Sequence, residues 1–325
     1  MVKKISYFIF MMILFYFLSR IITQIPFRQC IAQLQTISLL WFPFILIYLF
    51  VLLLLDTSSC YLYLRSIQPL SFIRYLYIDT MNHLLELIVF PPIPDSILLT
   101  QQHRLHIPLS TSLCVLLWER YLNAIPQIGI SFLPLLLLSK WMHATHPTLY
   151  LPILSIVFGM ILLFALNAGL ILLPQYAKGK FAWLMQAQDV LAHLWQQKKI
   201  MFYQLCIHLC YLILKHSVLI WCACMLQLSL SFEQAIFYFL LSILCDLLMM
   251  VIPMVGKHGI AEAVFLFLFA SVFQDTTLFS MMLLWRICTF YAPVFFYLCL
   301  VGILHVRIKQ ECSNHFAAFV KRKRK

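Results

Sequence analysis

The chain has 325 residues, of which 63% are hydrophobic and only 10% carry a charged side chain, with a formal net charge of +12. Soluble domains contain about 25% charged residues, and a folded soluble chain of this size has too few polar groups here to cover its apolar surface. The composition excludes an ordinary soluble enzyme, a disordered chain and a nucleic-acid-binding domain. It predicts an all-α polytopic transmembrane helix bundle.

A spanning helix needs about 20 mostly apolar residues, and the sequence contains ten hydrophobic segments of roughly this kind. In chain order they cover residues 5–25, 37–55, 72–94, 107–123, 124–139, 149–173, 200–226, 232–252, 260–273 and 278–304. We expect about seven or eight to span the membrane fully and the others to be broken or re-entrant. The first is too long for a signal-peptide core and has no small-residue cleavage site, so we expect it to remain as an anchor.

An amphipathic helix is predicted at residues 181–199, between halves that cover about 1–173 and 200–304. Leu184, Leu191 and Leu194 recur at helical spacing, whereas Gln188 and Asp189 lie on other faces. Such a pattern is typical of a helix on the cytoplasmic membrane surface, and the same helix would connect the halves. We expect a transmembrane domain at residues 1–304 and a basic cytoplasmic tail at residues 305–325.

The distribution of basic residues predicts the orientation. With the N-terminus inside, 15 of the 23 Lys and Arg side chains fall on the cytoplasmic side, and the opposite loops hold little beyond Arg28, Arg104 and Lys140. Because cytoplasmic loops are enriched in Lys and Arg, we expect both termini to be cytoplasmic. The basic tail is expected to contact anionic lipid headgroups rather than nucleic acid.

Ionisable side chains inside apolar segments are the candidates for function, because a charge in a membrane normally faces a cavity or a partner. These candidates are Asp79, Glu86, Glu119, Arg120, Lys215, Asp246, Glu262 and Arg286. Acids and bases are both present, so internal pairing is expected. Asp246 would pair with Lys215, and Glu262 with Arg286; for the first pair, a purely structural role is the alternative.

Metal and cofactor sites are not predicted. The 11 cysteines are scattered through apolar runs, and Cys206, His208 and Cys210 lack a second Cys/His pair at a zinc-site interval. The sequence also lacks a recognisable nucleotide-binding loop. We expect the cysteines to pack as small hydrophobic residues, and we expect no metal and no cofactor.

The chain between residues 252 and 262 reads as a broken helix. Four residues recur there at intervals of three: Pro253, Gly256, Gly259 and Glu262. Proline removes a helix donor and glycine permits unusual backbone, and non-helical backbone at membrane depth survives only where it lines protein or water. The following helix N-terminus and Lys257 both favour anionic groups. We therefore expect a polar cavity suited to a phospholipid headgroup, with Arg286 on the facing segment.

These residues resemble the C-terminal signature of the lysylphosphatidylglycerol synthase/flippase transmembrane family, a Pro-x-Pro-Gly-Gly-x-Gly-x-x-Glu run followed by an Arg-containing span. The matching positions are Pro253, Gly256, Gly259, Glu262, Arg286 and Gly302. Glu119 and Arg120 resemble the family's Glu-Arg element in the first half. The sequence departs from the pattern at Lys257, where a glycine is usual, and at Asn123, where an aspartate is usual. The family's Gly-Glu-x-x-Arg element is not recognisable at residues 91–95.

The resemblance implies a flippase-like integral membrane domain without the soluble aminoacyl-transferase domain, in the cytoplasmic (inner) membrane of a bacterium. It implies that substrate is bound or gated by Glu119, Arg120, Pro253, Gly256, Lys257, Gly259, Glu262 and Arg286. The proline-rich run Pro91–Pro94 and the break at 253–259 fall one in each half. Discontinuous segments at corresponding positions indicate an inverted repeat with a substrate site at its interface.

Three functions agree with these patterns. The first, which we favour, is a translocase that moves a polar-headgroup phospholipid or glycolipid across the membrane and is not an enzyme. The second is an intramembrane lipid-modifying enzyme, for which His258 and Glu262 would supply an acid–base pair, although no DxxD-like cluster for Mg²⁺ is present. The third is a non-transporting partner of a separate lipid-synthesising enzyme.

Overall fold

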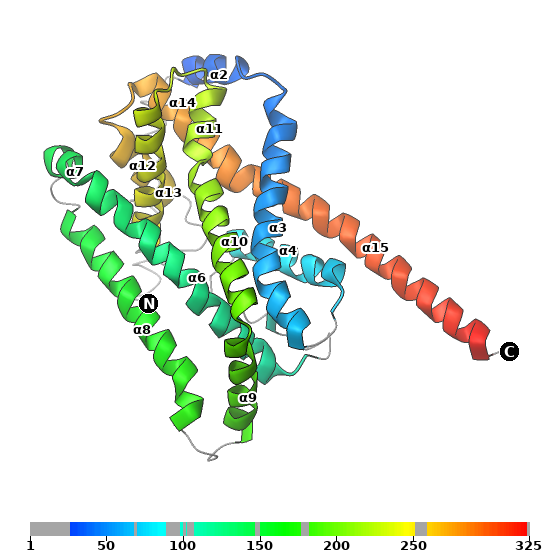
Figure 1. Ribbon diagram of the computed structural model, residues 1–325. Coiled ribbons are helices and arrows are strands. Elements are labelled where there is room, and N and C mark those ends of the chain that lie inside the picture. Colours follow the sequence, from blue (N-terminus) through cyan, green and yellow to red (C-terminus); the bar gives the residue numbers. More distant parts are fainter. Residues whose placement is uncertain are drawn as a thin grey trace, which may run out of the picture.

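The computed structural model describes residues 27–67, 70–88, 98–99, 102, 107–146, 150–176, 182–250 and 259–323. These residues are almost entirely helical and contain no strand, which confirms the all-α prediction for this part of the chain (Figure 1). The predicted segment 5–25, the run Pro91–Pro94 and the site candidates Pro253, Gly256 and Lys257 lie outside the described residues.

The first half contains several long helices, of which α6 (Leu109–Leu137) lies beside α8 (Tyr150–Tyr176) (Figure 1). Its helices are α2 (Phe27–Gln35), α3 (Trp41–Ile67), α4 (Phe72–Ile88), α6 (Leu109–Leu137), α7 (Ser139–Thr145) and α8 (Tyr150–Tyr176). Helix α6 packs along α8 and also contacts α3, whereas α4 packs chiefly against α15 of the second half. The two halves of the chain therefore share one bundle.

The segments 107–123 and 124–139, predicted as two helices, form the single helix α6, which contains Pro126 and Pro134. Each proline removes one backbone donor, but Leu122 and Ile130 are buried on either side of Pro126 and keep the helix packed across it. The break comes instead at Leu138, where the chain bends by 61° into α7.

Helix α9 (Ala182–Gln196) confirms a helix in the predicted 181–199 segment, between the two halves. The helices of the second half are α10 (Lys198–His216), α11 (Val218–Met225), α12 (Phe232–Met250), α13 (Ile260–Phe269), α14 (Asp275–Arg286), the π-helix η2 (Ile287–Tyr291) and α15 (Ala292–Lys323). Leu191 and Leu194 of α9 are buried in a cluster with Trp118 of α6, so this helix packs against the bundle. Its position on the membrane surface stays a prediction.

The helix through residues 275–323 contains a π-helical turn. Pro293 has no backbone N–H, so the carbonyl of Thr289 lacks its ordinary i+4 donor. The N–H of Ala292 bonds to the carbonyl of Ile287, five residues back. Such π-turns often lie at functional sites, and this one follows directly on Arg286.

Four described helical stretches are long and apolar enough to cross a membrane: Trp41–Ile67, Lys198–Met225, Phe232–Met249 and Thr276–Ile308. The bent pair α6–α7 would make a fifth, and Leu151–Leu166 and Ile260–Phe269 are shorter apolar helices. The expected seven or eight spans included residues 5–25, outside the described part. Several such helices in one chain make it a multi-pass membrane protein.

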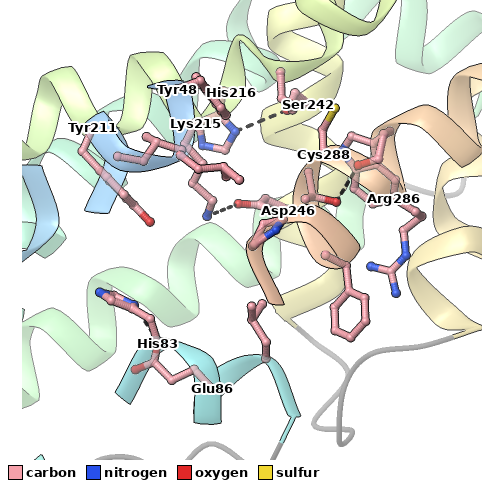
Figure 2. A pocket seen from close by; sticks show the side chains of 18 of the residues that line it. Tyr48, His83, Glu86, Tyr211, Lys215, His216, Ser242, Asp246, Arg286 and Cys288 are labelled. Atoms are coloured by element: carbon pink, nitrogen blue, oxygen red, sulfur yellow. Dashed lines mark hydrogen bonds and ion pairs between the residues drawn. The ribbon is translucent and has the colours of Figure 1, made fainter. Parts of the chain in front are cut away.

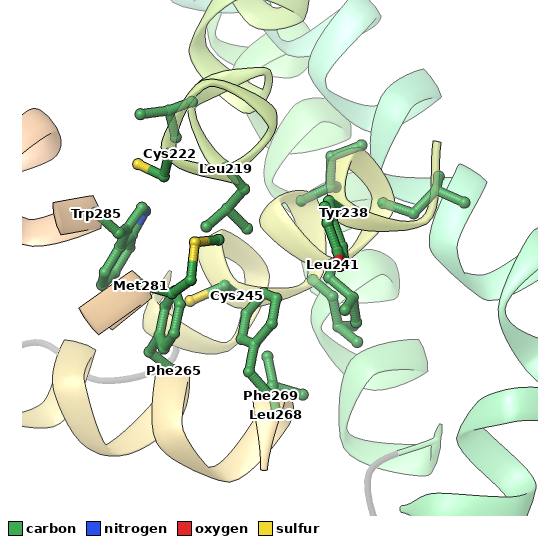
Figure 3. Packing of buried hydrophobic residues seen from close by; sticks show 14 of the residues in the cluster. Leu219, Cys222, Tyr238, Leu241, Cys245, Phe265, Leu268, Phe269, Met281 and Trp285 are labelled. Carbon is green, nitrogen blue, oxygen red and sulfur yellow. The ribbon is translucent and has the colours of Figure 1, made fainter. Parts of the chain in front are cut away.

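The main core lies where α11, α12, α13 and α14 meet (Figure 3). Phe265 of α13 stacks on Phe269 with 4.3 Å between ring centroids, and its ring lies 5.0 Å from that of Trp285 on α14. Each of these three side chains is at most 5% exposed. Their packing fixes α13 against α14 and so determines where Glu262 and Arg286 meet.

Candidate functional site

A cavity of about 410 Å³ lies between α3, α4, α10, α12 and the segment from Trp285 to Tyr297 (Figure 2). Its polar lining comprises Tyr48, His83, Glu86, Tyr211, Lys215, His216, Ser242, Asp246, Arg286, Thr289 and Tyr297. The remaining lining residues are mostly apolar, such as Leu49, Leu52 and Val218. Charged side chains of both signs therefore line a cavity between apolar helices, which is the usual location for charges within a membrane protein.

One charged element is the pair formed by Glu262 of α13 and Arg286 of α14. Arg286 Nε donates to Glu262 Oε1 at 2.6 Å, which confirms the predicted pairing. Glu262 Oε2 accepts a bond of 2.7 Å from the backbone N–H of Gly259. Gly259 has φ 77°, a conformation that suits glycine, and it begins α13. The carboxylate therefore joins the start of one helix to the guanidinium on another.

Arg286 lines the cavity although its side chain is only 8% exposed. Its Cζ lies 5.2 Å from the centroid of the Phe290 ring and 5.8 Å from that of Trp285. Aromatic faces attract a cation, and arginine keeps its charge at any physiological pH. The guanidinium is thus a fixed positive charge at the cavity wall.

A second ion pair joins α10 to α12. Lys215 Nζ lies 2.6 Å from Asp246 Oδ2, which confirms the predicted pair, and both residues line the cavity (Figure 2). Beside them, His216 Nδ1 and Ser242 Oγ lie 3.5 Å apart. These contacts place hydrogen-bonding groups on the wall made by α10 and α12.

A third charged element surrounds His83 of α4. His83 Nε2 lies 3.1 Å from Asp56 Oδ2 of α3 and 3.4 Å from Asp79 Oδ2, and Nδ1 lies 3.5 Å from Glu86 Oε2. Thr57 donates to Asp79 Oδ2 at 2.6 Å. We call His83, Asp56, Asp79 and Glu86 the acid–histidine cluster.

Sequence reasoning identified Asp79 and Glu86 but missed His83 and Asp56. The second segment was expected to end at residue 55, whereas α3 continues to Ile67 and places Asp56 in mid-helix. The signal for His83 was its spacing: it follows Asp79 by four residues and precedes Glu86 by three, so all three share one helix face.

Glu119 and Arg120 lie elsewhere, on α6, and neither is among the residues that line the cavity. Glu119 Oε1 accepts a bond of 2.5 Å from Ser59 of α3, whereas Arg120 is exposed. Gln204 of α10 donates to the Glu119 carbonyl at 3.5 Å and to Asn123 Oδ1 at 2.9 Å. The structure therefore pairs Glu262 with Arg286, which lines the cavity, whereas Glu119 and Arg120 are not among the lining residues.

In the described ranges, no group of three or more His, Cys, Asp or Glu side chains is placed to hold a metal ion.

A comparison with curated proteins gives no match. The family model described as Lysylphosphatidylglycerol synthase TM region matches residues 5–296, which include the cavity-lining residues up to Pro293. The chain belongs to this family, as the resemblance around Gly259, Glu262 and Arg286 implied.

Proposed function

We propose that the chain is a flippase-like lipid translocase, in which a polar phospholipid or glycolipid headgroup crosses through the cavity while the acyl chains stay in the bilayer. The observation that carries this proposal is the charged lining of a cavity between the helices of a multi-pass membrane protein. A headgroup offers no apolar surface to the bilayer core, so it needs a polar path. The family's description names a phospholipid, lysylphosphatidylglycerol, which supports a lipid substrate.

Arg286 is the group best suited to bind a headgroup phosphate. A guanidinium has five donors in a planar fork that matches phosphate oxygens, and Glu262 engages Nε. Because Glu262 is also bonded to the backbone of Gly259, the carboxylate stays in place when a phosphate approaches. Glu262 therefore acts as a positioning residue and Arg286 as the binding residue.

Lys215 and Asp246 form a second ion pair, in which each partner could instead pair with a charge of the headgroup. With no headgroup present, each neutralises the other, which lowers the cost of charges at membrane depth. A headgroup with its own charges would replace part of this pairing as it passes. This pair is then close to neutral both when the cavity is empty and when a headgroup is bound.

The proposal also includes residues outside the cavity lining and the topology of the chain in the membrane. Pro253, Gly256, Lys257 and Gly259 would also bind or gate the substrate, and Glu119 with Arg120 would form the corresponding element of an inverted repeat. The transmembrane domain would cover residues 1–304, with both termini, including the basic tail at 305–325, on the cytoplasmic side of a bacterial inner membrane.

The test is lipid movement in proteoliposomes. Fluorescent phospholipid would be followed as it changes leaflet, with wild-type protein, Arg286→Gln and the matched control Arg65→Gln, which alters an exposed arginine at the end of α3. We expect wild type and Arg65→Gln to move lipid equally and Arg286→Gln to lose most of the activity. No movement above protein-free vesicles with wild type, or a covalently altered lipid in the extract, would contradict the proposal.

A further inference from the structure

The charges around the cavity do not balance at the acid–histidine cluster. Arg286 pairs with Glu262 and Lys215 with Asp246, one cation to one anion each. At His83, by contrast, three carboxylates face a single imidazole. Even with the ring protonated, three ionised carboxylates would leave a net charge of about −2, which is costly in an apolar helix bundle.

Neighbouring elements do not remove this imbalance within the described residues. The titratable groups that face the cluster are Cys60 of α3, Tyr75 of α4, Tyr297 of α15, His208, Tyr211 and Lys215 of α10, Asp246 of α12 and Glu119 of α6. Lys215 is the one permanent cation among them, and its ammonium is bound to Asp246. Among the described charged groups around the cavity, the cluster is therefore the one in which carboxylates outnumber cations.

Protons fit the geometry better than a metal ion does. Both ring nitrogens of His83 face carboxylate oxygens, at 3.1 to 3.5 Å, and the ring thus occupies the centre where a cation would otherwise sit. Both nitrogens can donate at once only when the ring carries two protons. Chains of Asp, Glu and His in membrane helices are the usual carriers of protons.

The cluster also has an entrance and an interior. Glu86 is 44% exposed at its side chain and lines the cavity, as does His83 at 18%. Asp79 lies deeper, with a side chain 10% exposed, and is bonded to the fully buried Thr57. The contacts of His83 with Glu86 and with Asp79 therefore link the exposed carboxylate to the more buried one.

We infer that the acid–histidine cluster is a proton-binding site whose loading couples lipid movement through the adjoining cavity to a transmembrane proton gradient. The inference rests on the proposed translocation. Protonation changes the charge of the wall that α4 forms with His83 and Glu86, opposite the ion pair of α10 and α12 (Figure 2). It therefore alters how strongly the cavity holds a charged headgroup, without any covalent step.

The first test uses wild-type protein in proteoliposomes with and without a gradient of one pH unit. When one proton crosses the membrane with each lipid, a gradient of one pH unit can maintain a ratio of about ten between the lipid concentrations of the two leaflets. We expect the fluorescent lipid to redistribute toward one leaflet, and a protonophore to abolish the redistribution. Equal movement with and without the gradient would overturn the inference and leave the translocation intact. No movement under either condition would overturn both.

The second test compares His83→Gln with His305→Gln, a matched change on α15 outside the cavity lining, where His305 contacts Tyr77. We expect His83→Gln to lose the response to the gradient and His305→Gln to keep it. Asp56→Asn, which retains side-chain volume, provides the same readout where His83→Gln fails to fold. An unchanged gradient response in correctly folded His83→Gln or Asp56→Asn protein would overturn the assignment.

Discussion

The ion pair between Glu262 and Arg286 can be tested directly by substitution of either side chain. Glu262→Gln keeps an acceptor for the Gly259 N–H but removes the negative charge beside a guanidinium that is 8% exposed. Removing one partner of a fully buried pair costs about 3–5 kcal/mol. Because the Glu262 side chain is 24% exposed, solvent offsets part of this loss, and we expect about 2–3 kcal/mol.

The assay is a double-mutant cycle in detergent, with unfolding free energies measured for Glu262→Gln, Arg286→Gln and the combined variant. The loss in the combined variant should be smaller than the sum of the single losses by about 1–3 kcal/mol, since the second change removes a charge that has already lost its partner. Lys140→Gln, at an exposed position on α7, should show no measurable change. Additivity within about 0.5 kcal/mol would refute the claim that the two side chains act as a unit.

Three further changes test the surroundings of the site by unfolding in detergent. Gly259→Ala should lower the free energy of unfolding by about 1–3 kcal/mol, because alanine is strained at φ 77°. An unchanged unfolding midpoint would contradict the positive φ of this residue. Ser59→Ala should lower the free energy of unfolding by about 1–3 kcal/mol, because Glu119 loses its donor; an unchanged free energy of unfolding would contradict this bond. Lys215→Met should lower the free energy of unfolding, because Asp246 loses its partner. The double variant Lys215→Met with Asp246→Leu should recover part of this loss, because an apolar pair replaces the ion pair. A greater loss of unfolding free energy in the double variant would contradict this expectation.

The sequence predicted the membrane class and the two ion pairs because both follow from hydrophobicity. Apolar stretches such as 232–252 coincide with helices to within a few residues, and isolated charges within them have few partners to choose from. Arg286 and Glu262 are 24 residues apart, yet a charge in an apolar segment needs an opposite charge. This constraint made the pairing predictable without a structure.

The acid–histidine cluster was not predictable in the same way. It depends on where α3 ends, and the hydrophobic segment was expected to end at Leu55, before Asp56. In the structure Thr57 and Ser59 are fully buried and bonded to acids of other helices. Helix packing therefore overrides a local polar signal here, and only the tertiary contacts reveal it.

The neighbours of Glu119 were also not predictable from the sequence. Glu119 was identified as an ionisable residue inside an apolar segment, and the family resemblance made it a counterpart of Glu262, which stays a proposal. Its bond to Ser59 and its place outside the cavity lining depend on the rotation of α6 about its axis. A sequence pattern gives the helix face only relative to other faces of the same helix.

The central claim is that a lipid headgroup occupies the cavity against Arg286. Native mass spectrometry of purified protein, with lipids retained from the membrane, tests it most directly. We predict that wild type and Arg65→Gln retain a phosphate-bearing lipid of one headgroup class and that Arg286→Gln loses it. Equal amounts of the same lipid on all three proteins, or none on wild type, would contradict the account.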